Sequence, residues 1–320
     1  MVLWKVQSVA HPTIGIVLLG GLMDQYERLP YHSSAGIAYT LTDSESVART
    51  TLTVGTEKSS VNINGVEIDQ QDSRSPMKLI HKYSSSFLEK YRSDRVSIES
   101  VNENILSGSS DAGAAALGKC IDASIGVDPV SLELEMRKVS ESAGRSYHGG
   151  LTITYAGPRP FTRKILDESE FENIRIISAV FPHKRKPSDD IHTNQPRHEY
   201  YRSRMQNAER AVRELEMLSS RSDIKGIFEL AMRDTEDYHY MNSLVDVQIV
   251  TPEMRTLMDR INEWRSEIWM TYIVTGGNSV FIPTMRENAS EVTGLISGFT
   301  EEIHELRVAG GARLISSGFS

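Results

Sequence analysis

A run of small residues near the middle of the chain leads from a short predicted strand directly into an alanine-rich helix. Residues 105–115 read ILSGSSDAGAA and follow the predicted strand at 95–101. Glycine and serine here let backbone N–H groups approach an anion closely, and the start of the helix adds a favourable partial charge. Alternatively, Ser109 and Ser110 only cap a buried helix. The segment therefore predicts a strand–loop–helix unit that either binds phosphate or belongs only to the core.

The rest of the first half is rich in predicted strands. Apolar composition and length predict strands at 14–19, 34–41, 51–54 and 61–68. The last of these contains Asn64-Gly65, which is typical of a hairpin turn. One helix is expected at 75–92, where most apolar residues keep helical spacing.

The second half is expected to be richer in helices. Strands are predicted at 174–181, 271–274, 280–283 and 305–308, and helices at 192–219, 223–242, 252–270 and after Glu287. The apolar residues of the helix at 252–270 form one stripe, which is typical of a helix that packs on a core. Helices on one face of an antiparallel sheet describe an α+β arrangement.

Size, charge and cysteine content exclude several classes of protein. A chain of 320 residues favours two domains. The net charge of −8 argues against duplex nucleic acid as the main partner, because binding a phosphate backbone needs a clustered basic surface. The one cysteine, Cys120, excludes a disulfide within the chain and suits a reducing cytoplasm. The longest apolar run, at 14–23, is too short to span a membrane, so we expect a cytoplasmic protein without a membrane partner.

Four separate segments resemble one family, in the same order and with similar spacing over nearly the whole chain. Residues 106–112 are similar to the phosphate loop of the GHMP small-molecule kinases, usually written Gly-Leu-Gly-Ser-Ser-Ala-Ala. Residues 142–150 resemble the Ser-Ala-Cys-Arg-Ser…Gly-Gly segment of the mevalonate diphosphate decarboxylases, which belong to that superfamily. Residues 275–278 resemble their Asp-Ala-Gly-Pro motif, and residues 12–18 resemble their Thr-Asn-Ile-Ala-Leu-Ile-Lys opening.

This resemblance implies a fold and its ligands. The fold expected is the α+β GHMP kinase fold, with a ribosomal-protein-S5-like α/β domain at 1–172 and a ferredoxin-like domain at 173–320. ATP, Mg²⁺ and a small-molecule substrate would bind in the cleft between the two domains. Relatives are usually homodimers, so a homodimer is expected by analogy.

Three departures from the decarboxylase pattern indicate the reaction. Leu18 replaces a lysine of those enzymes, Thr275 replaces their catalytic aspartate, and Glu141 replaces a glycine that receives the substrate's diphosphate. Together these changes resemble the archaeal mevalonate 3-kinases. Loss of carbon dioxide after phosphorylation would need a carboxylate near the positive charge that develops at carbon 3, and Thr275 offers none. We therefore expect phosphorylation of (R)-mevalonate on its 3-hydroxyl without decarboxylation, as a step of archaeal isoprenoid synthesis.

Other functions are compatible with the same residues. A decarboxylase of a phosphorylated mevalonate would need a substitute for the absent aspartate. A mevalonate 3-phosphate 5-kinase would have to tolerate Glu141 beside the 5-oxygen. A GHMP-fold protein that only senses a ligand is the alternative outside enzymes, and the intact glycine–serine loop argues against it.

Glu141 and Arg145 predict how the substrate is recognised. A carboxylate at 141 would repel a bound diphosphate, but it can accept a hydrogen bond from a free 5-hydroxyl, which is worth about 1.5–3 kcal/mol. The guanidinium of Arg145 suits the substrate carboxylate because it offers a planar fork of donors. Alternatively, Glu141 and Arg145 pair with each other one helical turn apart.

The remaining site residues follow from the resemblance. Leu18 and Thr275 would form the pocket walls around the tertiary carbon of the substrate, and Ser107 would bind the substrate from the edge of the loop. No general base is assigned, because phosphoryl transfer depends mainly on the positioning of the reactants. The nucleotide would contact Ser107, Gly108, Ser109, Ser110, Asp111 and Arg185, with Mg²⁺ at Ser110. Arg185 lies in a basic turn that would alternatively be only solvated.

Overall fold

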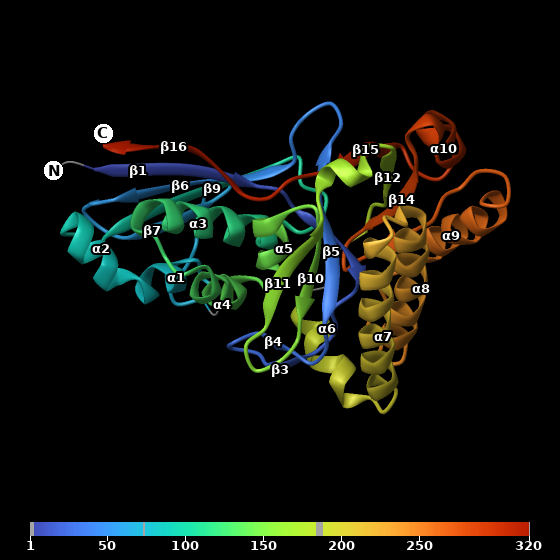
Figure 1. Cartoon of the computed structure of the whole chain (residues 1–320), viewed down its shortest axis with the longest axis horizontal. Helices are drawn as coiled ribbons and strands as arrows, with labels where there is room; N and C mark the ends of the chain where they lie inside the picture. The colour runs from blue at the N-terminus through green and yellow to red at the C-terminus, as the bar shows by residue number, and fades with distance from the viewer. Residues whose placement is uncertain (1–2, 73, 184–187, 320) are drawn as a thin grey trace.

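In the computed structural model, residues 3–72, 74–183 and 188–319 are described, and they form a mixed α and β fold built on two large sheets. The first sheet has six strands, and its neighbours are antiparallel except for the parallel pair β7 and β9. In spatial order the strands are β16 (Arg313–Phe319), β1 (Trp4–Ala10), β6 (Val47–Val54), β9 (Val96–Glu103), β7 (Ser60–Ile63) and β8 (Val66–Glu67). The two ends of the described chain therefore meet in this sheet, as Figure 1 shows.

The second sheet joins strands from both halves of the sequence. In spatial order they are β11 (Phe161–Leu166), β10 (Leu151–Tyr155), β5 (Ser34–Leu41), β15 (Glu302–Val308), β12 (Ile174–Val180), β14 (Ser279–Met285) and β13 (Ile273–Val274). The strand β2 (Thr13–Val17) also pairs with β5. A separate small ribbon consists of β3 (Leu22–Asp24) and β4 (Leu29–Pro30). Because β5 pairs with β2, β10 and β15, it ties the two halves together.

The helices fall into two groups. The first group is α1 (Met77–Lys82), α2 (Ser84–Tyr91), α3 (Ser109–Ile125), α4 (Pro129–Val139) and α5 (Ala143–His148). The second group is α6 (Ser188–Asn194), α7 (Tyr201–Ser220), α8 (Ile224–Ser243), α9 (Pro252–Trp264) and α10 (Ala289–Ile296), and single 3-10 turns lie at Glu168–Phe171, Gln195–Arg197 and Arg286–Asn288. In Figure 1 the first group lies beside the six-stranded sheet and α7, α8 and α9 lie at the opposite end of the molecule. Within the described residues no helix has the length and apolar character needed to cross a membrane.

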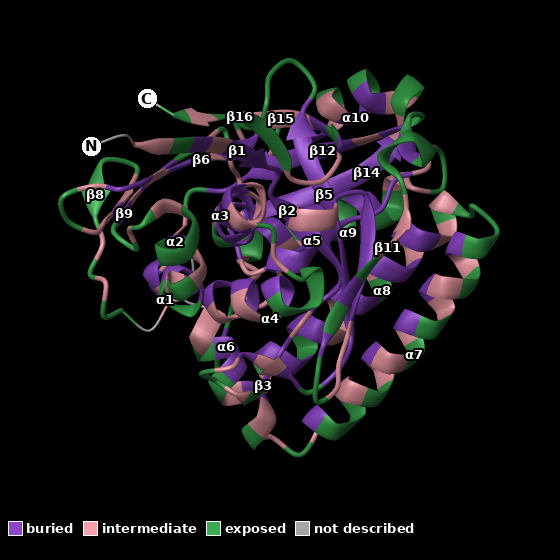
Figure 2. Ribbon diagram, turned by 60° about the vertical axis from the view of Figure 1, so that its left-hand side comes forward, coloured by how far each residue is buried: buried purple, intermediate pink, exposed green. Residues whose placement is uncertain are grey.

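The helix α3 packs directly on the first sheet because its inner face is made of small residues. Ala112, Ala115 and Ala116 are fully buried there. The hydroxyl of Ser8 on β1 donates to the carbonyl of Ala116 at 2.5 Å, which fixes the helix on the strand. Figure 2 shows α3, β2 and β5 as the buried centre of the molecule. The start of α3 is therefore held rigidly between the two sheets.

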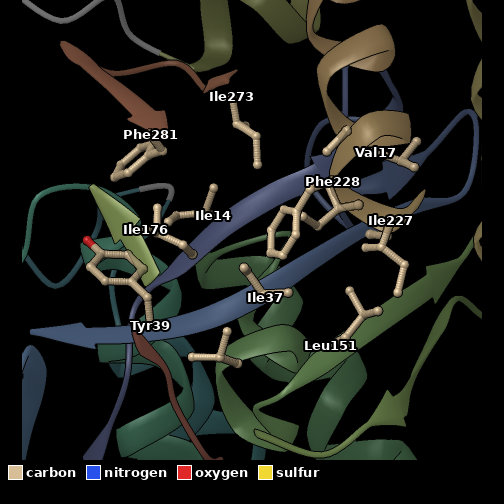
Figure 3. Close-up of a cluster of buried hydrophobic side chains, with 14 of the residues drawn as sticks. Ile14, Val17, Ile37, Tyr39, Leu151, Ile176, Ile227, Phe228, Ile273 and Phe281 are labelled. Carbon is tan, nitrogen blue, oxygen red and sulfur yellow. The ribbon is translucent and has the colours of Figure 1, made fainter. Parts of the chain in front are cut away.

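The main apolar core connects the two halves. It contains Ile14 from β2, Ile37 from β5, Ile176 from β12, Phe228 from α8 and Phe281 from β14. Figure 3 shows these side chains together around β2 and β5. The division at 172 and 173 remains a prediction, and β16 returns from the second half to the first sheet.

Three predicted helices have clearly different bounds in the structure. The helix expected at 192–219 is divided into the end of α6 and the helix α7, which begins at Tyr201, because Pro196 lacks the N–H that a helix interior needs. The helix expected at 75–92 is two helices separated at Tyr83. The helix expected at 252–270 ends at Trp264.

Candidate active site

One pocket collects the residues that the sequence singled out. It has a volume of about 310 Å³ and lies among the end of β2, the start of α3, the segment before α5, α6, α8 and the segment after β13. The predicted residues that line it are Leu18, Ser107, Gly108, Ser109, Ser110, Asp111, Glu141, Arg145 and Thr275. Arg185 falls outside the described residues. The predicted residues of four segments that are distant in sequence, at 18, 107–111, 141–145 and 275, thus line one cavity.

The loop before α3 is held by its backbone. The phenol of Tyr39 accepts from the N–H groups of Leu106 and Ser107 at 3.0 and 2.8 Å, and lies 2.9 Å from the carbonyl of Ser107. Gly108 has φ of 79°, and a Cβ there would lie 2.8 Å from the backbone N of Thr13. Only glycine fits this close approach without strain. The loop is therefore fixed in place before any ligand binds.

Asp111 links the loop to two neighbouring segments. Its carboxylate accepts from the hydroxyls of Thr13 at 2.8 Å and Ser140 at 2.5 Å. Burial raises the pKa of Asp111, and these hydrogen bonds and the charge of Arg145 oppose that rise only in part. Both carboxylate oxygens already accept a hydrogen bond, so in this geometry Asp111 orients the loop.

Leu18 is held in the pocket wall by a buried ion pair. Its N–H donates to Asp234 at 2.6 Å, and its carbonyl accepts from Arg204 at 2.7 Å. Arg204 and Asp234 themselves pair at 2.5 Å, and their side chains are 0% and 2% exposed. Burial lowers the pKa of Arg204, but the charges of Asp234 and Asp237 outweigh burial and raise it. The backbone of Leu18 is therefore fixed by both of its polar groups.

Glu141 pairs with residues other than Arg145, which was its partner in the alternative interpretation. Its carboxylate accepts from Arg28 Nε at 2.8 Å and lies 3.1 Å from His192 Nε2. A second guanidinium, that of Arg74, lies 3.8 Å away. Burial alone would raise the pKa of Glu141, but the His192 hydrogen bond and the nearby cations hold it well below its ordinary value. The carboxylate at this end of the pocket therefore stays charged.

Arg145 lines the pocket from α5. Its guanidinium donates to the hydroxyl of Ser34 at 2.5 Å, and its side chain packs over Gly36 of β5. Burial lowers the pKa of Arg145, with Asp111 and Glu141 opposing this. Within the described residues its Nε has no hydrogen-bond partner. A buried cation with an unused donor is suited to an anionic group of a ligand.

The side chains of Thr275 and Ser107 are hydrogen-bonded to each other in the pocket lining. Their hydroxyl oxygens lie 3.3 Å apart. The preceding carbonyl, of Val274, is 2.8 Å from His239 Nε2 on α8, which fixes the segment after β13. Two neutral hydroxyls thus occupy the place where the decarboxylase pattern has a carboxylate.

A second cavity adjoins the first. It has a volume of about 230 Å³, is mainly apolar, and shares Ser109 and Ser110 with the first pocket. Its apolar lining includes Ile63, Ile98 and Leu117. An apolar cavity that ends at a glycine–serine helix start suits a flat base joined to phosphates. Among the described residues no group of three or more histidine, cysteine, aspartate or glutamate side chains is arranged to hold a metal ion.

Comparison with known proteins places this geometry in a family. Residues 10–164 match the diphosphomevalonate decarboxylase-like N-terminal domain, and residues 186–290 match the mevalonate-3-kinase C-terminal domain. A mevalonate-3-kinase from Picrophilus torridus is 42% identical, over 99% of both chains. The chain belongs to the mevalonate-3-kinase family. The resemblance predicted from the four segments is thereby confirmed.

Further relatives agree with this assignment. A mevalonate 3-kinase from Thermoplasma acidophilum is 40% identical, over 96% of this chain and 97% of its own. A solved structure of mevalonate-3-kinase from Thermoplasma acidophilum, with mevalonate 3-phosphate and ADP bound, has a TM-score of 0.93 and 38% identity. It covers 98% of this chain and 99% of that chain. The mixed α and β fold of this mevalonate-3-kinase family member is therefore that of its relatives.

Several residues of the mevalonate-3-kinase pocket were not predicted. Tyr238 lines the pocket from α8. His192 lines it from α6, and Arg28 reaches Glu141 from the β3–β4 ribbon. None of these stands in a recognisable motif, since each is brought to the site only by the fold.

Proposed function

We propose that the protein transfers the terminal phosphoryl group of ATP to the 3-hydroxyl of (R)-mevalonate and releases mevalonate 3-phosphate and ADP. The observation that carries the proposal is the pocket, whose lining combines neutral Thr275 and Leu18 with the cation of Arg145 and the charged carboxylate of Glu141. Membership of the mevalonate-3-kinase family supports the same reaction.

Mevalonate has three groups that match three parts of this pocket. Its carboxylate would bind Arg145, which is 5% exposed and offers a planar fork of donors. Its 5-hydroxyl would donate to Glu141, since a carboxylate with two hydrogen bonds keeps acceptor capacity. The 3-hydroxyl would then lie near Ser107 and Thr275, beside the loop that begins α3.

The nucleotide would extend from the loop into the apolar cavity. The base would lie among residues such as Ile98 and Leu117, and the phosphates would lie at Gly108, Ser109 and Ser110. Magnesium accepts hard oxygen ligands and is usually bound through substrate phosphates, so a single hydroxyl, from Ser110, fits such an ion. Bound there, the ion would neutralise charge on the phosphates.

The chain's own residues would act by positioning. Tyr39 holds the loop by accepting from the N–H groups of Leu106 and Ser107, and Gly108 allows its close approach to Thr13, so the phosphates would meet the start of α3. We assign no general base, because phosphoryl transfer with a loose transition state depends mainly on position and electrostatics. Neutral side chains at 18 and 275 would give no stabilisation to a positive carbon 3, so the phosphorylated product would keep its carboxylate.

The test is a product assay with purified protein, Mg-ATP and mevalonate, followed by mass spectrometry and phosphorus NMR. We expect one phosphate on the tertiary oxygen and no evolved carbon dioxide. Carbon dioxide would instead support a decarboxylase, and transfer only to mevalonate 3-phosphate would support a 5-kinase. A protein that transfers phosphate to none of these would be a ligand sensor. We also propose a homodimer, by analogy with GHMP kinases, and light scattering in solution tests it.

A further inference from the structure

A buried histidine of α8 is linked to the first pocket through the backbone of a neighbouring strand. His239 is 7% exposed and does not itself line that pocket. Its Nε2 lies 2.8 Å from the carbonyl oxygen of Val274. Because a carbonyl oxygen can only accept, Nε2 carries the hydrogen and donates it. Burial lowers the pKa of His239 to about 4, with the Val274 hydrogen bond opposing this, so the ring brings no charge at neutral pH.

Thr275 stands between this carbonyl and a pair of glycines. The strand β13 ends at Val274, and Gly276-Gly277 follow Thr275 directly. A second anchor lies at Asn278, whose carbonyl accepts from the N–H of Phe181 at 2.8 Å and whose amide donates to the carbonyl of Phe181 at 3.0 Å. Glycine has wide freedom of backbone conformation. The direction of the Thr275 side chain therefore depends mainly on the anchor at Val274.

The same helix holds a second part of the pocket wall. Asp234 of α8 accepts from the N–H of Leu18 at 2.6 Å, and Tyr238, one turn later, lines the pocket itself. Asp234 and His239 thus each hold a backbone segment that carries a pocket residue. A regular helix fixes the spacing of its residues, so α8 sets how these two segments are placed relative to each other.

The ring of His239 also borders a separate cavity. This cavity has a volume of about 500 Å³ and lies between the end of α8 and the start of α9, where Ser243 and Arg255 line it as well. Among the described residues Nδ1 of His239 has no hydrogen-bond partner, and Val274 is the one hydrogen-bond partner of its side chain. Packing alone therefore does not hold the ring against β13, and the bond to Val274 is needed to keep it there.

We propose that His239 is a positioning residue for phosphoryl transfer and that it acts through Val274 on the hydroxyl of Thr275. This hydroxyl lies 3.3 Å from that of Ser107, beside the place given to the 3-hydroxyl of mevalonate, so the inference rests on the proposed function. Phosphoryl transfer depends on position, and a misplacement of about 1 Å can cost about 10²-fold in rate. The base of the nucleotide would lie in a cavity that other segments line, so loss of His239 should lower kcat and leave the KM for ATP unchanged.

The experiment is steady-state kinetics with Mg-ATP and mevalonate on variants of His239. His239→Met removes the donor and keeps apolar bulk, so its kcat should fall at least about tenfold. His239→Gln should keep most of the activity, because its amide nitrogen reaches the place of the imidazole Nε2 and can donate to Val274. The matched control is Tyr272→Phe, which removes the 2.7 Å hydrogen bond from Tyr272 to Glu236 of α8, two residues before Val274. Its kcat should stay at the wild-type value.

A chemical rescue separates the hydrogen bond from the bulk of the ring. His239→Ala leaves a space that adjoins the cavity at the start of α9, so a small molecule can enter. At a pH where both are neutral, imidazole carries an N–H that can donate to the Val274 carbonyl, whereas 1-methylimidazole has none. We expect imidazole, and not 1-methylimidazole, to raise the kcat of His239→Ala.

A double-mutant cycle tests the route through Thr275. If His239 acts on that hydroxyl, His239→Met should lower kcat little further in a Thr275→Val background. The inference is overturned if a folded His239→Met keeps the wild-type kcat, if its loss is the same in Thr275→Val, or if the two imidazoles restore activity equally.

Urea unfolding and ATP binding check that each variant is folded. Should His239→Met not fold, His239→Asn decides, since its shorter amide does not reach Val274. A wild type that does not phosphorylate mevalonate refutes the proposed function before any variant is made, whereas equal kcat values of the wild type and the His239 variants refute only the positioning role.

Discussion

Replacing Asp234 with asparagine tests whether the buried ion pair between Asp234 of α8 and Arg204 of α7 positions the pocket wall. One carboxylate oxygen of Asp234 accepts from both Leu18 N–H, at 2.6 Å, and Arg204 Nη2, at 3.0 Å. The other accepts from Arg204 Nη1 at 2.5 Å. An amide can present only one acceptor oxygen, so its NH₂ group would face a donor whichever way it is turned.

The size of the effect follows from burial. Arg204 and Asp234 are 0% and 2% exposed, and removing one partner of such a pair leaves an uncompensated charge that costs about 3–5 kcal/mol. Asp237 remains 3.0 Å from Arg204, so we expect a loss near the lower end, about 3 kcal/mol. Since Leu18 loses one of its two backbone anchors, the KM for mevalonate should also rise.

Urea unfolding and steady-state kinetics measure both effects. The matched control is Arg233→Ala, which breaks the neighbouring ion pair between Arg233 of α8 and Glu214 of α7. That pair is also 2.5 Å long, but its side chains are 58% and 44% exposed. Exposed pairs contribute at most about 1 kcal/mol, so the control should stay close to the wild type. If Asp234→Asn loses no more stability than Arg233→Ala, or keeps the wild-type KM, the positioning argument is wrong.

Three further substitutions test other parts of the structure. Gly108→Ala places a Cβ 2.8 Å from Thr13 N at φ of 79°, so it should lower stability by about 1–3 kcal/mol and weaken ATP binding, as unfolding and calorimetry would show. Gly294→Ala, with open space at its Cβ within α10, should instead stabilise by up to about 1 kcal/mol. Burial lowers the pKa of His32 from 6.5 to about 3, so its contribution to stability is full above pH 6.5 and is lost as pH falls toward 3. His32→Asn should therefore flatten the acid limb of the stability curve by about 1.4 kcal/mol per pH unit, and an unchanged slope in urea unfolding at several pH values would contradict this.

Elements with a strong local signal could be predicted from the sequence. The strand at 34–41 has the same bounds in the structure, and Asn64-Gly65 forms the turn between β7 and β8. In contrast, β16 was missed because it is mostly exposed and is stabilised by pairing with β1, about 300 residues earlier in the chain. The strand β16 forms only because it pairs with a distant part of the chain, and a pattern within a few neighbouring residues cannot reveal such a contact.

The same distinction applies to the pocket. Residues that lie in the family's sequence motifs, such as Ser107, Arg145 and Thr275, could be placed near one another because the family pattern records them. Arg28 and His192 could not be placed near Glu141 from the sequence. Arg28 lies in the turn between β3 and β4 and His192 lies on α6, and only the folded chain brings them to Glu141. Local sequence propensities carry no information about which distant residues meet in the folded chain.

These partners change the physical reason for the expected substrate preference. From the sequence, Glu141 is a bare carboxylate that repels phosphate at a distance. In the structure its charge is compensated by Arg28 and Arg74, so little net negative charge remains to act at long range. Rejection of a 5-phosphate must then come mainly from occupancy of the donors and space that the phosphate would need, a short-range effect that salt screens weakly. Discrimination against mevalonate 5-phosphate by the wild type should therefore change little with ionic strength, whereas repulsion by an unpaired carboxylate would weaken as salt is added.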